Sequence, residues 1–232
     1  MDNQPKKISP RTIGMMLVFI VVIPFLPLLI SRRWDWWEAW VYVIIGILGF
    51  AVSRMLAARR NPDLLAERAH FLQHQDAKPW DKILAPLVGL GGGFIPLVAG
   101  LEARFAWPTP FNLLVKILAL VFILAGYALA SYALIENRFF SGMVRIQTDR
   151  GHHLVSSGPY LWVRHPGYAG ALLTYLATPF FLDSRWSFLP VLFITIVLVI
   201  RTSLEDKVLQ NELEGYRNYT KQIRYRLLPG VW

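Results

Sequence analysis

The chain has 232 residues, of which 55% are hydrophobic, and its mean hydropathy is +0.41. These values are well above those of a soluble domain, because several uncharged runs are as long as a bilayer crossing. The chain contains no cysteine, which excludes disulfides, thiolate catalysis and cysteine-based metal sites. We attribute the net charge of +9 to basic residues that flank membrane spans and meet anionic lipid, rather than to nucleic-acid binding.

Apolar segments predict an all-α, polytopic integral membrane protein with about six transmembrane helices. The segments are residues 13–30, 38–56, 83–101, 112–135, 167–181 and 188–200. Tryptophans between residues 34 and 40 fit a membrane interface. Lys116, near the start of the fourth segment, is expected to extend its amine to the interface.

Charge predicts how the spans are oriented. Residues 183–185 form a short turn, so the last two spans make an antiparallel hairpin. With six spans, 19 of the 24 Lys and Arg residues lie on the side of the N-terminus. This bias predicts that both termini are cytoplasmic, in our interpretation at a bacterial inner membrane. We expect one membrane domain, in which residues 1–135 supply four spans and residues 136–232 the catalytic loop, the hairpin and the tail.

The connecting segments carry further signals. Residues 61–63 predict the start of a short interfacial helix. His70 and His74 share a helix face, but a third ligand at suitable spacing is missing, so we predict no metal site. Residues 136–151 form a partly amphipathic stretch that we expect at the membrane surface or against the site. The tail, residues 204–232, predicts a helix capped at Gly215 and then a basic, aromatic part that suits lying on lipid or closing a pocket.

Residues 152–168 read HHLVSSGPYLWVRHPGY and hold groups that apolar membrane protein does not need. The titratable ones are His152, His153, Tyr160, Arg164, His165 and Tyr168. Pro166 suits the first position of a helix, whose free N–H groups favour an anion. The plainer alternative is a rigid turn between two membrane helices.

Other site chemistries are less well supported. Ser156 or Ser157 near a histidine would suit a hydrolase, but the chain has no nucleophile elbow. Adjacent histidines seldom both coordinate zinc, and no carboxylate is placed to help them. Arg201 and Glu205 lie one turn apart at the end of the last span. They either form a mutual salt bridge or each bind one ligand, and we favour the second interpretation.

Four elements, in order along the chain, carry a resemblance to a known family. They are the stretch 152–168, the sequence RTSLE at 201–205, Tyr219 and the ending RYRLLPG. Together they resemble the isoprenylcysteine carboxyl methyltransferases and, more distantly, the phospholipid N-methyltransferases. The resemblance is strong over residues 136–232, whereas the first three spans match only as hydrophobic segments. It departs from the family at Glu205-Asp206, where relatives often carry two glutamates.

The resemblance implies an integral-membrane enzyme that uses S-adenosyl-L-methionine. Arg201 would face the substrate, and Arg164 is the second candidate catalytic residue. The residues implied to bind the cofactor are Gln147, His152, His153, Leu154, Val155, Tyr160, His165, Pro166, Gly167, Tyr168 and Glu205.

The residue chemistry agrees with carboxyl methylation, because a carboxylate acceptor is already ionised at neutral pH and needs no general base. The expected partners are a lipophilic or lipidated substrate and membrane lipid, without nucleic acid. An amine or phospholipid N-methyltransferase, a sterol-reductase-like enzyme with a nicotinamide cofactor, and a non-enzymatic scaffold or heme-associated accessory protein remain alternatives.

Overall fold

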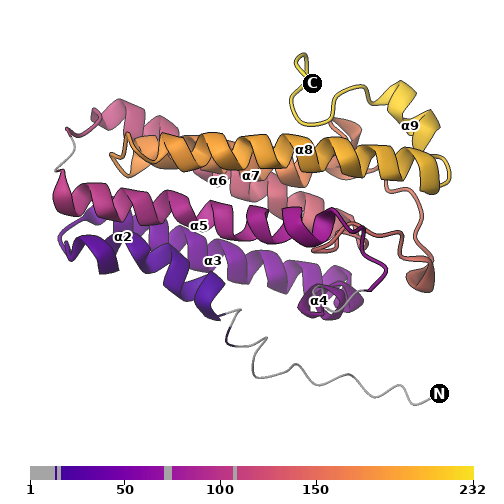
Figure 1. Cartoon of the computed structure of the whole chain (residues 1–232), viewed down its shortest axis with the longest axis horizontal. Coiled ribbons are helices and arrows are strands. Elements are labelled where there is room, and N and C mark those ends of the chain that lie inside the picture. Colours follow the sequence, from indigo (N-terminus) through magenta and orange to yellow (C-terminus); the bar gives the residue numbers. More distant parts are fainter. Residues whose placement is uncertain (1–13, 15–16, 71–74, 107–108) are drawn as a thin grey trace.

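The computed structural model describes residue 14 and residues 17–70, 75–106 and 109–232, without the side chain of residue 19 (Figure 1). The start of the first predicted span and His74 lie outside the described residues.

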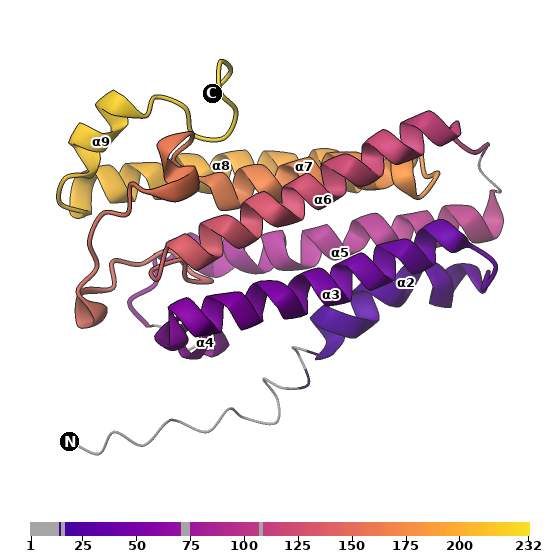
Figure 2. The same ribbon diagram turned by 180° about the vertical axis from the view of Figure 1, so that it is seen from behind.

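Long helices run side by side along one axis, as both views show (Figures 1 and 2). The elements are η1 (Val18–Val22), α2 (Ile23–Ser31), α3 (Trp37–Arg60), α4 (Pro62–Ala69), α5 (Asp81–Phe105), α6 (Leu113–Glu136), η3 (Thr148–Arg150), η4 (Gly158–Leu161), α7 (Pro166–Phe181), α8 (Phe188–Glu212) and α9 (Tyr216–Gln222). The turns α2–α3 and α7–α8 lie at one end of the bundle, whereas α4, α9 and the segment between α6 and α7 lie at the other. We call the end of the bundle that contains α4, α9 and the segment between α6 and α7 the site end.

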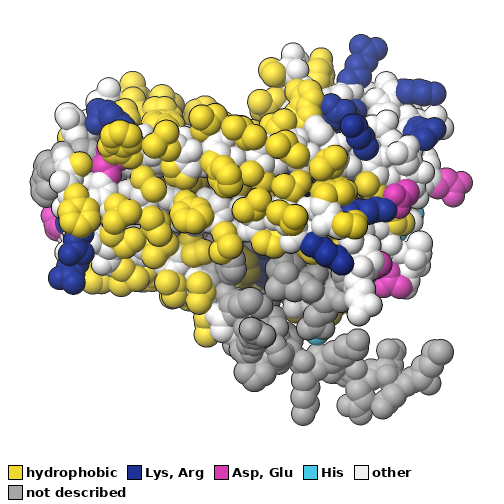
Figure 3. Space-filling view, viewed as in Figure 1, with side chains coloured by type: hydrophobic (Ala, Val, Ile, Leu, Met, Phe, Trp, Pro, Cys, Tyr) yellow, Lys and Arg dark blue, Asp and Glu magenta, His cyan; other side chains and the backbone are white. Residues whose placement is uncertain are grey.

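The chain is a polytopic, all-helical membrane protein. Within the described residues, α3, α5, α6 and α8 are long and apolar enough to cross a bilayer. On the face seen in Figure 3, exposed apolar side chains form a broad belt across the helices, and charged side chains gather at both ends of it. Helix α7 has 16 residues and the apolar helix Ile20–Ser31 is also short, so six spans stay a prediction.

Local signals place the helix ends. The side chain of Asn112 accepts a hydrogen bond from the backbone N–H of Val115 at 2.9 Å, which caps α6. Pro166 opens α7, as expected. Helix α8 continues 12 residues past the predicted end of the span at 200, and Gly215, with φ of +80°, precedes α9 instead of closing α8.

Close approach of small residues fixes the packing of α6 against α7. A Cβ added to either Gly126 or Gly170 would lie 2.5 Å from the carbonyl oxygen of the other. The two backbones therefore touch, which only glycine permits. This crossing holds the start of α7 beside the end of α6, where the site begins.

The prediction for Lys116 is wrong. Its amine is buried and pairs with Glu38 of α3 and Asp183 of the α7–α8 turn. These two carboxylates hold the amine inside the bundle. The three side chains join α3, α6 and the α7–α8 turn at the end of the bundle opposite the site.

Lys116→Ala should destabilise the protein by about 3–5 kcal/mol, because it leaves two buried carboxylates facing each other without a cation. Thermal unfolding in detergent measures the effect. Lys207→Ala, which removes an exposed lysine from α8, is the control and should melt as the wild type does. Equal melting temperatures for the two variants would contradict a stabilising role for the triad.

Candidate functional site

The site end contains a cavity that is lined by α8, the start of α7, the segment between α6 and α7, and α9 and the residues just before it. It encloses about 770 Å³ of space free of protein atoms, part of it open to solvent. Every predicted site residue except Pro166 lines it: Gln147, His152, His153, Leu154, Val155, Tyr160, Arg164, His165, Gly167, Tyr168, Arg201 and Glu205. Pro166 is buried at the first position of α7.

Glu205 and Arg201 are joined through a tyrosine. The Tyr168 hydroxyl donates to Glu205 Oε2 at 2.7 Å and accepts from Arg201 Nη1 at 2.6 Å. Arg201 donates its other nitrogens to the carboxylate of Asp81, with Nε to Oδ1 at 2.7 Å and Nη2 to Oδ2 at 3.0 Å. Arg201 and Glu205 therefore do not form a direct salt bridge, and that interpretation is wrong.

Sequence reasoning missed Asp81. This residue is fully buried at the start of α5, and its Oδ2 also accepts from the backbone N–H of Val144 at 2.6 Å. Asp81 thus binds both α8 and the segment after α6. The one signal in the sequence is an isolated acid at the start of an apolar span, at the end where the polar loop lies.

Asp206, the residue after Glu205, is also fully buried and has the largest set of donors in the site. Its contacts are Arg164 Nε at 2.8 Å and Nη2 at 3.0 Å, His165 Nε2 at 3.4 Å, Gln210 Nε2 at 2.8 Å, the Tyr216 hydroxyl at 3.1 Å and Arg226 Nε at 3.0 Å. They come from the polar loop, α8, α9 and the C-terminal segment. Asp206 therefore closes the site by joining these four parts.

The same contacts occupy most of the guanidinium of Arg164, whose catalytic role stays a prediction. Two of its nitrogens face Asp206, and Nη1 donates to the carbonyl oxygens of Ile223 and Arg224 at 3.0 and 2.9 Å. Four of its five N–H groups are thus used by the protein. Arg164 lies at the cavity wall and joins the polar loop to α8 and to the residues after α9.

One wall of the cavity is built on Phe139. The His152 ring packs against the Phe139 ring at a tilt of 31°, with centroids 4.5 Å apart, and Gln147 Nε2 donates to the carbonyl oxygen of Phe139 at 2.7 Å. His152 Nδ1 accepts from the backbone N–H of Gln147 at 3.3 Å. Burial, helped by the nearby charges of His153, Arg145 and Arg150, lowers the pKa of His152 to about 4. His152 is therefore neutral at physiological pH.

The segment 136–151 packs against the site. Phe139, Phe140 and Met143 line the cavity, and Ile146 packs on the cluster that contains Leu213, Tyr216 and Tyr219. Of the two expected positions, the membrane surface and the site, the structure shows the second.

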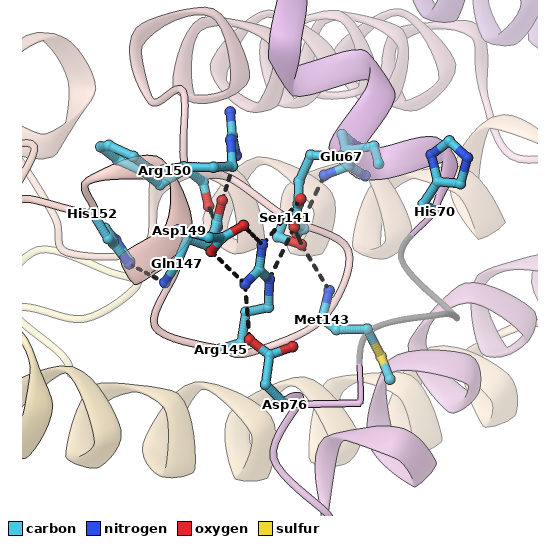
Figure 4. Close-up of polar contacts among 12 residues, drawn as sticks. Glu67, His70, Asp76, Ser141, Met143, Arg145, Gln147, Asp149, Arg150 and His152 are labelled. Atoms are coloured by element: carbon cyan, nitrogen blue, oxygen red, sulfur yellow. Dashed lines mark hydrogen bonds and ion pairs between the residues drawn. The ribbon is translucent and has the colours of Figure 1, made fainter. Parts of the chain in front are cut away.

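Arg145 holds this segment against the loop after α3, as Figure 4 shows. Its guanidinium contacts Glu67 of α4 at 3.1 Å, Asp76 at 2.8 Å and Asp149 at 2.9 Å. The helix α4 begins where residues 61–63 predicted it. Within the described residues no group of His, Asp and Glu is arranged to hold a metal ion.

Two tyrosines close the cavity from α9. The Tyr219 hydroxyl donates to the carbonyl oxygen of Tyr160 at 2.6 Å, which ties α9 to η4. Burial raises the pKa of Tyr160, Tyr216 and Tyr219 well above the usual range of tyrosine. All three are neutral and serve as hydrogen-bonding and apolar walls.

Residues 117–211 match the isoprenylcysteine carboxyl methyltransferase (ICMT) family. The matched region starts in α6, covers the loop 152–168 and nearly all of α8, and includes every predicted site residue. It confirms the resemblance inferred from the sequence and supports a membrane methyltransferase. The methyltransferases of this family use S-adenosylmethionine in general.

The chain is also similar to the Delta(14)-sterol reductase TM7SF2 of Mus musculus, with 29% identity over 153 residues. The matched region covers 60% of this chain but only 37% of the reductase. The similarity fits the sterol-reductase-like alternative.

Asp206→Asn should free the C-terminal segment, because Arg164 and Arg226 would lose the charge that holds them to α8. Breaking a buried pair of this kind costs about 3–5 kcal/mol. Limited trypsin digestion should then cleave faster at Lys221 and Arg224, which are both exposed. Asp35→Asn, at an exposed carboxylate on the opposite end, should be digested at the wild-type rate. Unchanged cleavage in Asp206→Asn would contradict the role of Asp206.

The lowered pKa of His152 predicts that the stability of the protein depends on pH. The unfolded chain takes up a proton near pH 6.5, whereas the folded chain takes it up only near pH 4. The melting temperature should therefore fall as pH decreases from 6.5 to 4, and this part of the loss should be absent in His152→Gln. Melting curves of both proteins, compared with those at pH 8, measure it. Parallel curves across this pH range would show that His152 is not buried as a neutral ring.

Proposed function

We propose that the protein is an S-adenosylmethionine-dependent methyltransferase that acts on a lipophilic acceptor at the cytoplasmic membrane face. The favoured reaction is carboxyl O-methylation of an isoprenylcysteine-like or other lipidic carboxylate. The observation that carries the proposal is the environment of Glu205. Within the described residues, this cavity carboxylate contacts one hydroxyl group and has no Lys, Arg or His at ion-pair distance. Because no cation of the described residues pairs with it, this carboxylate is suited to bind a cationic group of a ligand.

The other parts of the cavity fit the rest of the cofactor. Glu205 would bind the ammonium group. The N-terminus of α7 and His165 would bind the carboxylate. Nε2 of His165 faces Asp206, and its Nδ1 has no hydrogen-bond partner among the described residues. Leu154, Val155 and the Phe139 wall offer apolar surface to the adenine. When bound, the cofactor supplies an electrophilic methyl group.

The chain has to align the acceptor and exclude water, because a carboxylate acceptor needs no general base. Arg201 remains our candidate for orienting the acceptor, although Asp81, Tyr168 and Gly142 use four of its five N–H groups. The remaining Nη1 N–H would donate to the acceptor carboxylate. Asp81 would hold the guanidinium in place.

The membrane arrangement is part of the proposal. We infer six spans with both termini and the site end in the cytoplasm, at a bacterial inner membrane. The excess of Lys and Arg on that side supports this orientation. The acceptor would enter from the bilayer and the cofactor from the cytoplasm.

The similarity to a sterol reductase favours a second candidate, a membrane reductase that uses a nicotinamide cofactor. Equilibrium binding in detergent separates the two, because a methyltransferase binds S-adenosylhomocysteine and a reductase binds NADPH. Activity assays with a prenylated cysteine, a fatty acid and an amine lipid then distinguish O- from N-methylation.

The purified protein should bind S-adenosylhomocysteine, and Glu205→Gln or His165→Ala should weaken this binding. Losing a charge-assisted partner costs about 1.5–3 kcal/mol, which is at least tenfold in Kd. Calorimetric titration measures it. Glu214→Gln, which removes an exposed carboxylate beyond α8, should bind as the wild type does. If both site variants keep wild-type affinity, neither residue contacts the cofactor.

Arg201→Lys should lower turnover strongly while the affinity for S-adenosylhomocysteine stays near wild type. Lysine keeps the charge but loses the planar fork that Asp81 and Tyr168 hold in place. Methyl transfer to a prenylcysteine analogue and calorimetric binding are measured on the same sample. Loss of cofactor binding together with a lower melting temperature would instead make Arg201 a structural partner of Asp81.

A further inference from the structure

The last residues of the chain form a turn that bends back along the bundle. After α9, residues 224–232 are not helical, and the carbonyl oxygen of Trp232 accepts the N–H groups of Arg226 and Leu227 at 2.9 and 3.0 Å. Figure 1 shows this segment returning beside α8 from α9 toward the apolar belt. We call residues 224–232 the C-terminal turn.

Packing sets the depth of this turn. Leu227 is 3% exposed and belongs to the same buried cluster as Leu172 of α7 and Ile194 and Leu198 of α8, and Trp232 packs against that cluster. Ile194 and Leu198 lie inside the apolar part of α8. The C-terminal turn therefore sits against the cytoplasmic part of the membrane helices and not free in the cytoplasm.

The opposite face of the turn is apolar and uncovered. Leu228 and Val231 are 46% and 77% exposed. On the polar loop, which the turn contacts, Trp162 is also exposed and packs edge-on against the exposed Tyr132 of α6, with centroids 6.5 Å apart. In Figure 3 the apolar belt continues onto this end of the molecule, with basic side chains next to it. Aromatic side chains of this kind are typical of a membrane–water interface.

The charged residues of α9 and the C-terminal turn are all basic. From Gly215 to the end, the chain has four basic residues and no acidic one. Lys221 and Arg224 are exposed, and no carboxylate of the described residues lies at ion-pair distance from either. Basic residues at this position attract anionic phospholipid headgroups.

We propose that the C-terminal turn is seated in the cytoplasmic leaflet of the membrane that the protein spans. Leu228 and Val231 enter the boundary of the acyl chains, and Lys221 and Arg224 meet headgroup phosphates. Lipid is the occupant because the exposed apolar face continues the belt that the bilayer already covers, at a depth fixed by Leu227.

The C-terminal turn is hydrogen-bonded to residues of the site. The N–H groups of Arg164 and His165 donate to the carbonyl oxygens of Tyr225 and Arg226 at 3.0 and 2.9 Å, and Arg226 Nε donates to Asp206. The turn therefore helps to position His165 at the start of α7. Contact with the membrane fixes the position of the C-terminal turn, and the turn fixes the position of this cavity wall. This is so whichever ligand the cavity binds.

Spin labels in a bilayer test directly whether the C-terminal turn lies in the membrane. The chain has no cysteine, so labels can be introduced one at a time. Leu228→Cys and Val231→Cys are labelled in the full chain, in nanodiscs of phosphatidylcholine with phosphatidylglycerol. Relaxation by oxygen reports contact with lipid, and relaxation by a water-soluble nickel chelate reports contact with water. Both labels should show high oxygen access and severalfold lower nickel access than an aqueous position.

Two reference labels calibrate the result. Ile196→Cys lies on the exposed apolar face of α8, and Glu214→Cys is exposed beyond α8. Labels at 228 and 231 should resemble the one at 196. Nickel access equal to that at 214 would place the turn in water, and low access to both reagents would indicate a protein contact. Either result would overturn the proposal, and neither depends on methyl transfer.

Discussion

The closed form of the site depends on one buried carboxylate, that of Asp206. A charge with no exposure to water is costly unless several donors surround it, and no single segment of this chain supplies enough of them. Arg164 and His165 come from the polar loop, Tyr216 from α9 and Arg226 from the C-terminal turn. The four parts must therefore converge for α8 to bury Asp206. The cavity is the space that they enclose.

The neighbouring acid has the opposite environment, and this contrast explains the chemistry of the site. Asp206 and Asp81 are fully buried and bound by arginine, so their charges are used by the fold. Glu205 faces the cavity and contacts only the Tyr168 hydroxyl among the described residues. Structural ion pairs thus fix the walls, and one carboxylate is left for a ligand. Glu205 and Arg201 lie on the same helix. The Tyr168 hydroxyl lies between them and forms a hydrogen bond to each.

Local patterns were enough to predict the apolar helices, the start of α7 and the loop that lines the cavity, because each depends on neighbouring residues. Pairing across the chain was not predictable in this way. Arg201 meets Asp81 from 120 positions away, and Lys116 meets Glu38 from 78 positions away. A single sequence shows that each charge needs a partner but not which one. For the segment 136–151 the sequence left two positions open, the membrane surface and the site, and only the packing of Phe139, Phe140 and Met143 around the cavity decides between them.

The central claim is that this cavity, formed around Glu205, holds S-adenosylmethionine. Ultraviolet cross-linking of the radiolabelled cofactor to the protein in bilayers, followed by peptide mapping, tests it most directly. Label is expected in peptides from residues 137–168 or 201–219, and S-adenosylhomocysteine should compete with it. Label confined to other peptides, or no label that S-adenosylhomocysteine displaces, would contradict it.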